Sequence, residues 1–217
     1  MPKYIKARQG PKGSVIYTDP EGNEWIFEGG YIPWRNQNPG DLVPGNVSRR
    51  NGSIGSANGF AVFPDYKTGH AALLDSLKTV HGDQDIPALM HDYAPPSDNN
   101  NTARYIRFIR KKTGIKDDKK VKNFSKPEFE KLWRAIEAFE GWGKKPGTIH
   151  LFQKKARIIG VHLDKHGIID RYNIESYGWV SKDQGVALTQ QGKVDAIVVI
   201  SPPGHPFLRG RPGHAIS

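Results

Sequence analysis

Glu140 is the residue whose position most favours acid–base chemistry. It closes an amphipathic segment, residues 127–140, and is followed by Gly141 and Trp142. The C-terminal end of a helix carries a partial negative charge, so a carboxylate there is destabilised and its pKa rises. A carboxyl with a raised pKa keeps its proton near neutral pH and can donate it to a leaving group. Lys or Arg would stabilise this helix end better, which indicates that function overrides local stability here.

Glu28 is a second candidate acid. It ends a predicted strand, residues 24–28, and shortly precedes a polar loop, residues 34–42. For each glutamate the alternative interpretation is a solvated side chain at the end of an element. The sequence alone leaves both Glu140 and Glu28 open as proton donors.

The loop of residues 34–42 concentrates hydrogen-bonding groups on a short, stiff piece of backbone. Its Pro39-Gly40 pair predicts a tight turn, because Pro fixes φ and Gly permits positive φ. The Arg and Asn side chains of this loop supply donors and acceptors that suit sugar hydroxyls and N-acetyl groups, and nearby aromatic rings suit stacking. The alternative is a turn whose Asn side chains cap their own backbone. The residues that we expect to bind a ligand are Trp34, Arg35, Asn36, Asn38 and Tyr93.

Residues 35–42 (RNQNPGDL) resemble the RNNNPGN(L/I) signature of the phage-type, lysozyme-like proteins. Segments 59–73, 93–100 and 135–142 resemble the same family in the same order, so the similarity covers about two thirds of the chain. The chain departs from the family pattern at three positions. Gln37 and Asp41 stand where the signature has Asn, and Asp98 stands where Glu is commoner.

The resemblance implies an enzyme that cleaves peptidoglycan glycan strands, as a muramidase or a lytic transglycosylase. Such enzymes use a carboxylic acid to protonate the glycosidic oxygen. Phe139-Glu140-Gly141 is similar to the Phe-Glu-Gly of phage lysozymes, but there the helix precedes the NPG-like loop, so a permuted order is implied. We therefore expect Glu140 to point into a groove beneath the loop of residues 35–40. The resemblance implies no cofactor. Its expected partners are peptidoglycan or another wall polymer and, for an antibacterial toxin, an inhibitory immunity protein.

The charge distribution leaves two other functions open. The net charge is +10, and residues 101–150 hold 14 Lys and Arg against 6 Asp and Glu. Such a surplus attracts polyanions, including nucleic acid and anionic wall polymers. The alternatives are a non-catalytic cell-wall-binding module and a nucleic-acid-binding protein that uses the basic segment 104–126. The ordinary interpretation of that segment is a solvated helix face.

Composition excludes several kinds of site. The chain has no Cys, which excludes disulfides, thiolate metal sites and Cys–His nucleophiles. His162 and His166 flank a predicted turn and have no clear third ligand, so we predict no metal site. Residues 1–6 lack the apolar core of a signal peptide, and no apolar run is long enough to span a membrane. We expect a protein made in the cytoplasm and then delivered to the periplasm or carried in a phage or secretion particle.

These observations predict an α+β protein of two domains. Residues 1–146 are expected to form a mainly helical, lysozyme-like domain with a small N-terminal β-hairpin at residues 14–28. Residues 144–147 are the predicted linker, and residues 147–217 are expected to form a small ββαβ domain of unknown function. Residues 44–59 are nearly all turn formers and predict a mobile loop. Helices are predicted over residues 67–81, 85–93, 103–112 and 127–140.

Overall fold

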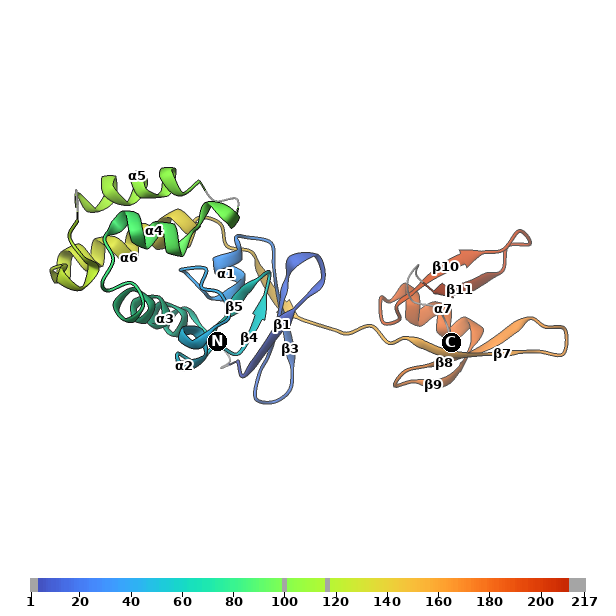
Figure 1. Cartoon of the computed structure of the whole chain (residues 1–217). Helices are drawn as coiled ribbons and strands as arrows, with labels where there is room; N and C mark the ends of the chain where they lie inside the picture. The colour runs from blue at the N-terminus through green and yellow to red at the C-terminus, as the bar shows by residue number, and fades with distance from the viewer. Residues whose placement is uncertain (1–3, 99–100, 116–117, 211–217) are drawn as a thin grey trace. The chain divides into compact units, whose positions relative to one another are not determined.

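The computed structural model describes residues 4–98, 101–115 and 118–210. It is a mixed α+β structure, and it divides into two compact units, Met1–Phe152 and Gln153–Ser217 (Figure 1). The first unit extends six residues beyond the expected boundary at residue 146. The reason is that Thr148–Leu151 forms strand β6, which pairs antiparallel with β3 and so belongs to the first unit.

A six-stranded sheet, rather than a small hairpin, forms one side of the first unit. Its strand order is β5-β4-β1-β2-β3-β6, and β1 and β4 are its one parallel pair among the described strands. The predicted hairpin is present as β2 and β3, with Tyr17 opposite Trp25. The strands are β1 (Lys6–Gln9), β2 (Val15–Thr18), β3 (Glu24–Glu28), β4 (Gly55–Ala57), β5 (Phe60–Val62) and β6 (Thr148–Leu151).

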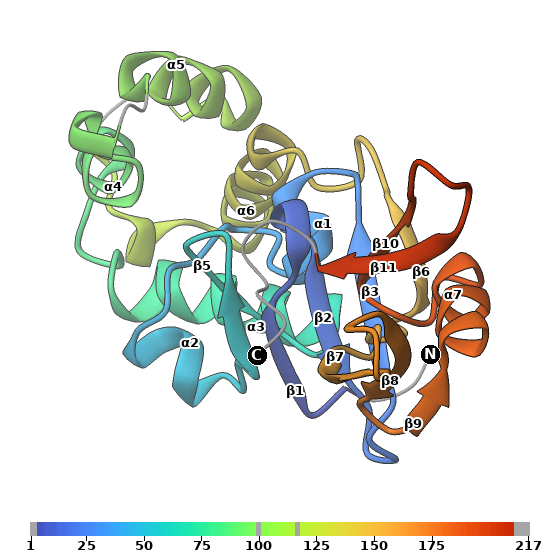
Figure 2. The same ribbon diagram turned by 90° about the vertical axis from the view of Figure 1, so that its right-hand side faces the viewer.

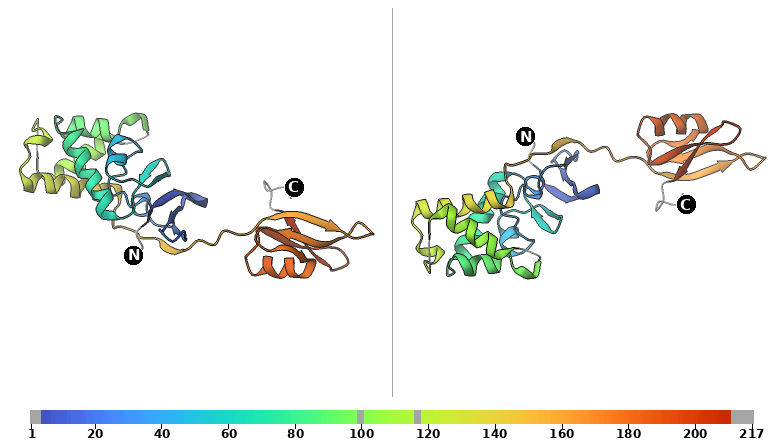
Figure 3. Two further views of the ribbon diagram at one scale, coloured as in Figure 1. Left: turned by 90° about the horizontal axis from the view of Figure 1, so that it is seen from below. Right: turned by 90° about the horizontal axis from the view of Figure 1, so that it is seen from above.

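Helices of residues 66–140 form the other side of the first unit, away from the strands (Figures 1 and 3). The α-helices of this unit are α1 (Ile32–Asn36), α2 (Asn46–Arg50), α3 (Tyr66–Thr79), α4 (Ile86–Tyr93), α5 (Thr102–Thr113) and α6 (Lys126–Glu140). Short 3-10 turns occur at η1 (Pro11–Gly13), η2 (Pro96–Asp98) and η3 (Val121–Asn123). The four longer helices agree with the predicted ranges to within two residues at each end. The predicted loop of residues 44–59 instead contains α2 and β4.

Helix α6 shows why these sequences form helices where they do. Ser125 is its N-cap: the Ser125 Oγ accepts the Glu128 backbone N–H, and the Glu128 carboxylate accepts the Ser125 N–H at 2.6 Å. Leu132 and Ile136 are fully buried on one face, in a core shared with α3, α4 and α5. Gly141 ends the helix in the left-handed region with φ 95°, which a residue without Cβ adopts at little cost. Burial of one face fixes the direction in which the carboxyls of α6 point.

The second unit is a smaller α+β structure with more strands than predicted. It contains β7 (Ile158–Leu163), β8 (Ile169–Ile174), β9 (Gly178–Ser181), α7 (Lys182–Gln190), β10 (Ala196–Ile200) and β11 (Pro206–Gly210). The strands form a three-stranded sheet, β7-β8-β9, and a two-stranded sheet, β10-β11. Figures 2 and 3 show α7 packed beside these strands. The predicted ββαβ order therefore omitted β9 and β11.

Among the described residues, no helix combines the length and the apolar character that crossing a membrane requires. Two motif residues, Asn99 and Asn100, lie outside the described residues, as do residues 116 and 117 of the basic segment.

Candidate functional site

The segment of residues 34–42 begins in the last turn of α1, continues toward α2 and is held against α3. Gln37 caps α1 in the left-handed region with φ 50°, and its side-chain amide donates to the Trp34 carbonyl at 2.8 Å. Gly69 of α3 lies directly under this turn. A Cβ at Gly69 would stand 2.0 Å from the Gln37 carbonyl oxygen, so only glycine permits this approach. The loop is thus a fixed scaffold.

Asn36 and Asn38 build this loop and do not face a ligand. Both are fully buried. The Asn36 amide donates to the Ala57 carbonyl at 2.8 Å, and the Asn38 amide donates to the carbonyls of Leu42 and Ala61. The Asn38 Oδ1 also accepts the Leu42 N–H at 3.0 Å. Their predicted role in sugar binding is not supported, because these bonds occupy the amides and leave no surface for a ligand.

Arg35 and Trp34 are half-buried, and each has an internal partner. The Arg35 Nη1 donates to the carbonyls of Gly29 and Gly30 at 2.8 and 2.7 Å. The ring of Trp34 packs on Phe27 with centroids 5.4 Å apart. Arg35 also lies close enough to Asp41 for its positive charge to lower the pKa of that carboxyl. Arg35 therefore contributes charge to the site while it anchors the loop.

Tyr93, at the end of α4, connects the helices of the first unit to the loop of residues 34–42. Its hydroxyl donates to the carbonyl of Gly40. Burial raises its pKa well above the usual range, and the nearby carboxyls of Glu140, Asp41 and Glu137 raise it further. Three acidic side chains therefore surround this tyrosine beneath the loop.

The Glu140 carboxyl lies close enough to Tyr93 and Asp41 for its charge to raise the pKa of both. Its Oε1 accepts a hydrogen bond from the Tyr105 hydroxyl at 2.6 Å. Burial raises the pKa of Glu140, whereas the Tyr105 hydrogen bond and the charge of Lys144 lower it. The pKa of Asp41 rises in turn because of the Glu140 charge. Glu140 is thus largely desolvated, hydrogen-bonded on one oxygen and adjacent to a second carboxyl.

Asp41 is the member of the cluster that the sequence did not predict. Burial and, to a smaller extent, the charge of Glu140 raise its pKa to about 8, although the charge of Arg35 opposes both effects. Its Oδ1 is buried with no hydrogen-bond partner among the described residues. At neutral pH Asp41 therefore retains its proton for most of the time. The sequence signal was its departure from the signature, an Asp where the family has Asn.

Glu137 forms a second group one helical turn before Glu140. Its Oε1 lies 2.8 Å from the His70 Nδ1, and the Tyr66 hydroxyl donates to the same carboxyl at 3.2 Å. The ring of Tyr66 stacks on Trp142 at 4.7 Å. Burial and the Glu137 charge raise the pKa of Tyr66 to about 12. The i, i+4 spacing of Tyr66 and His70 on α3 could have indicated this group.

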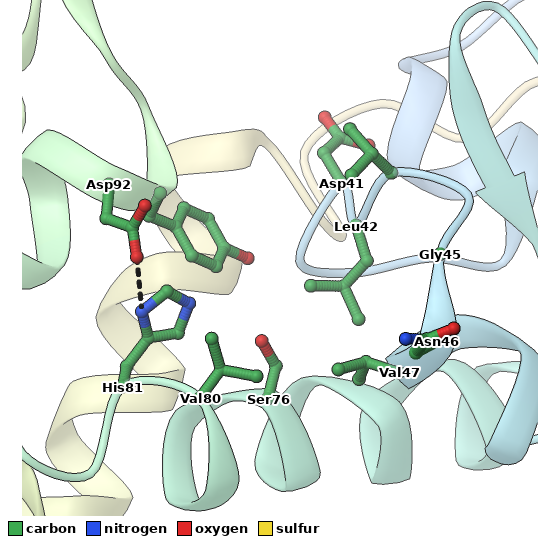
Figure 4. A pocket seen from close by; sticks show the side chains of 11 residues that line it. Asp41, Leu42, Gly45, Asn46, Val47, Ser76, Val80, His81 and Asp92 are labelled. Carbon is green, nitrogen blue, oxygen red and sulfur yellow. Dashed lines mark ion pairs between the residues drawn. The ribbon is translucent and has the colours of Figure 1, made fainter.

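A pocket of about 280 Å³ opens beside the cluster, between the segment 41–47 and helices α3 and α4 (Figure 4). Asp41 and Tyr93 line it and so belong both to the pocket and to the acidic cluster. Figure 4 shows His81 and Asp92 on one side of the pocket and Asp41 and Leu42 across from them. The pocket, which could hold a ligand group, therefore lies beside the desolvated carboxyls of Asp41 and Glu140.

The remaining candidates lie elsewhere. Glu28, at the end of β3, is exposed, and its nearest charged partner is His150 at 3.9 Å. Its carboxyl is therefore not desolvated as that of Glu140 is. His162 pairs with Asp170 at 2.5 Å on the second unit, and His166 lies in the β7–β8 turn. The described residues contain no group of three His, Asp or Glu side chains able to hold a metal ion.

Chemically, the cluster fits proton transfer. A buried carboxyl with a raised pKa can donate a proton, and a neighbouring carboxyl that titrates near neutrality can hold one. We compared the chain with protein families, curated proteins and solved structures, and none of these comparisons found a match. The interpretation of the site therefore depends on its own geometry and on the motifs in the sequence.

Proposed function

We propose that this protein cleaves the glycan strands of peptidoglycan, as a muramidase or a lytic transglycosylase. The observation that carries the proposal is the largely desolvated Glu140 carboxyl, held by Tyr105 and coupled to Asp41, a residue of the segment that resembles the lysozyme-like signature. Protonation of a glycosidic oxygen requires a carboxylic acid that remains neutral near physiological pH. Desolvation raises the pKa of Glu140 and so favours its protonated form.

In the proposed mechanism Glu140 first donates its proton to the glycosidic oxygen. The resulting carboxylate then accepts a proton from the incoming nucleophile, which restores the acid. If the nucleophile is water, the product is a reducing sugar. If it is the C6 hydroxyl of the same muramyl residue, the product is a 1,6-anhydro sugar. Tyr105 orients the carboxyl through its hydrogen bond to Oε1.

The experiment that tests the proposal is digestion of purified sacculi by the native protein, followed by mass analysis of the released muropeptides. Reducing ends would assign a muramidase, and 1,6-anhydro ends would assign a lytic transglycosylase. If sacculi remain intact over a range of pH and salt while still capturing the protein, the binding-module alternative replaces the enzyme. If they are neither cleaved nor bound, the proposal fails.

The substrate class suggests where the protein acts. Peptidoglycan lies outside the cytoplasm, so we extend the proposal to a protein delivered to the wall, as a phage component or an antibacterial effector. An effector of this kind would need an inhibitory immunity protein in the cell that makes it. Co-purification of such an inhibitor, with loss of wall cleavage in the complex, would support the effector role.

A second candidate function is binding of polyanions through α5. Arg104, Arg107 and Lys111 share one exposed face of this helix, while Ile109 is buried on the other. Such a face suits the phosphates of nucleic acid. Binding of DNA or RNA whose logarithmic affinity falls linearly with the logarithm of salt would support this function. No binding at low salt would exclude it.

A further inference from the structure

A second pocket of the first unit lies between the last turn of α3, the short turn η3 and the first turns of α6. Its volume is about 470 Å³, which is within the range of small-molecule sites. It shares no residue with the acidic cluster around Glu140. The residues that line it are Lys78, Val121, Lys122, Phe124, Lys126 and Phe129.

The walls of this pocket are held in place by the backbone. The Val121 N–H donates to the Gln84 carbonyl at 2.9 Å, and the Lys122 N–H donates to the Gly82 carbonyl at the same distance. These bonds fix η3 against the segment that follows α3. The opposite wall begins at the Ser125 cap, which fixes the first turn of α6. A pocket with fixed walls binds a ligand at a smaller entropic cost.

The charge of the pocket is positive. Three lysines line it, and no Asp or Glu does. Lys122 pairs with Asp83, but the Asp83 side chain is 74% exposed, and such surface pairs are weak. Among the described residues no carboxylate pairs with Lys78 or Lys126. An anionic group is therefore the ligand that this pocket attracts.

The floor of the pocket is apolar and aromatic. Phe124 and Phe129 are half-buried and pack against the helical core, and Val121 is buried beside them. The Lys78 Nζ lies 5.3 Å from the centre of the Phe129 ring, so a cation and an aromatic surface stand together. Aromatic rings stack on the flat bases of nucleotides, and lysine ammonium groups bind phosphate. A ligand with an aromatic part and a phosphate would use both features.

We propose that this pocket binds a nucleoside phosphate, with the base against Phe124 and Phe129 and the phosphates at the three lysines. The inference goes beyond the proposed function, because the site lies apart from Glu140 and needs no cleavage of sacculi. A free nucleotide and an unpaired nucleotide of a single strand offer the same chemistry. The experiment below distinguishes these two sources.

The test is isothermal titration calorimetry of the full chain with adenosine diphosphate, adenosine and inorganic pyrophosphate. Adenosine diphosphate should bind about tenfold more tightly than either fragment, because it alone makes both the stacking and the phosphate contacts. Equal binding of adenosine diphosphate and either fragment would overturn the proposal, as would no binding of adenosine diphosphate. Competition by single-stranded oligodeoxyadenylate, with tighter binding, would assign the single strand, and no competition would assign the free nucleotide.

Lys126→Gln and Lys131→Gln form a matched pair of variants. Both lysines are exposed on α6, but only Lys126 lines the pocket. Lys126→Gln should weaken the binding of adenosine diphosphate by about tenfold, which corresponds to one lost charged hydrogen bond. Lys131→Gln should leave binding close to that of the native protein. Equal weakening by both variants would assign the attraction to net charge alone and overturn the site.

Phe129→Leu tests the position of the base. Leu retains apolar packing against the helical core but removes the ring. The variant should bind adenosine diphosphate about tenfold more weakly, since stacking on the ring is lost. Its affinity for pyrophosphate should not change, which also shows that the pocket is folded. Unchanged affinity for adenosine diphosphate would overturn the proposed stacking, and if the variant does not fold, the comparison of the two lysine variants decides.

Discussion

Replacing Asp41 with Asn should remove a proton-binding site whose pKa differs greatly between the folded and unfolded chain. In the folded protein burial raises this pKa to about 8, and Arg35 opposes the effect. In the unfolded chain an Asp has a pKa of about 3.9. Asp41 has φ 46°, and Asn adopts this left-handed region more readily than most residues. The substitution should therefore preserve the backbone while it abolishes the titration.

The sign of the effect follows from proton linkage. Between about pH 4 and pH 8 the folded state holds the Asp41 proton and the unfolded state does not, so stability falls as pH rises. One pKa unit corresponds to about 1.4 kcal/mol, so the full shift of about four units corresponds to about 6 kcal/mol. Because Asp41 retains some solvent exposure, we expect a measured difference of roughly 2 to 4 kcal/mol.

The assay is urea unfolding of the native protein and Asp41→Asn at several values between pH 4 and pH 8.5, followed by tryptophan fluorescence. A Trp179→Phe background confines the signal to the first unit, which contains the other four tryptophans. Arg35, Glu140 and Tyr93 face Asp41 in both proteins, and because the Glu140 charge is coupled to Asp41, the difference reports the titration of this pair of carboxyls. We expect equal stability at pH 4 and a more stable variant at pH 8.5. Parallel curves would refute the buried, protonated Asp41.

Three further variants test the site. Asn38→Ala removes three buried hydrogen bonds and leaves the Leu42 N–H without its partner, so urea unfolding should show a loss of about 2 to 4 kcal/mol; unchanged stability would contradict its structural role. Gly69→Ala drives a Cβ into the Gln37 carbonyl and should cost about 3 kcal/mol in the same assay; a neutral result would refute the close approach. Tyr105→Phe removes the bond that lowers the pKa of Glu140, so the alkaline limb of wall cleavage should move to higher pH, and an unmoved limb would contradict this coupling.

Local signals predicted the helices well because their ends are encoded in a few residues. Ser125 and Glu128 fix the start of α6, and Gly141 fixes its end. The sheet was predicted only in part: β1, β4 and β6 were missed, and the edge strand β6 has no sequence pattern of its own. All four residues of β6 are exposed, and the strand forms because its backbone pairs with the free edge of β3. Such pairing depends on residues more than a hundred positions away and is not visible in a sequence window.

The candidate site was predicted in part for a similar reason. Glu140 could be selected from its unfavourable helix end, and its orientation follows from the buried face of α6. The side chains of Asn36 and Asn38 could either bind a ligand or stabilise a turn, and the sequence does not distinguish these roles. Both side chains are fully buried, which assigns them to the turn. Asp41 carries no local signal for its raised pKa, because the shift arises from burial and from Glu140 on a distant helix.

The most direct test of the central claim is the rate at which Glu140→Gln releases soluble muropeptides from purified sacculi, with Glu28→Gln as the matched control. Gln can still accept the Tyr105 hydrogen bond but cannot donate the catalytic proton. We expect Glu140→Gln to lose cleavage by a factor of about 100 to 10,000, the range typical of general acid catalysis. Its thermal unfolding should remain close to that of the native protein, and Glu28→Gln should cleave normally. Native cleavage rates in Glu140→Gln, or loss of cleavage in Glu28→Gln alone, would contradict the assignment of Glu140 as the acid.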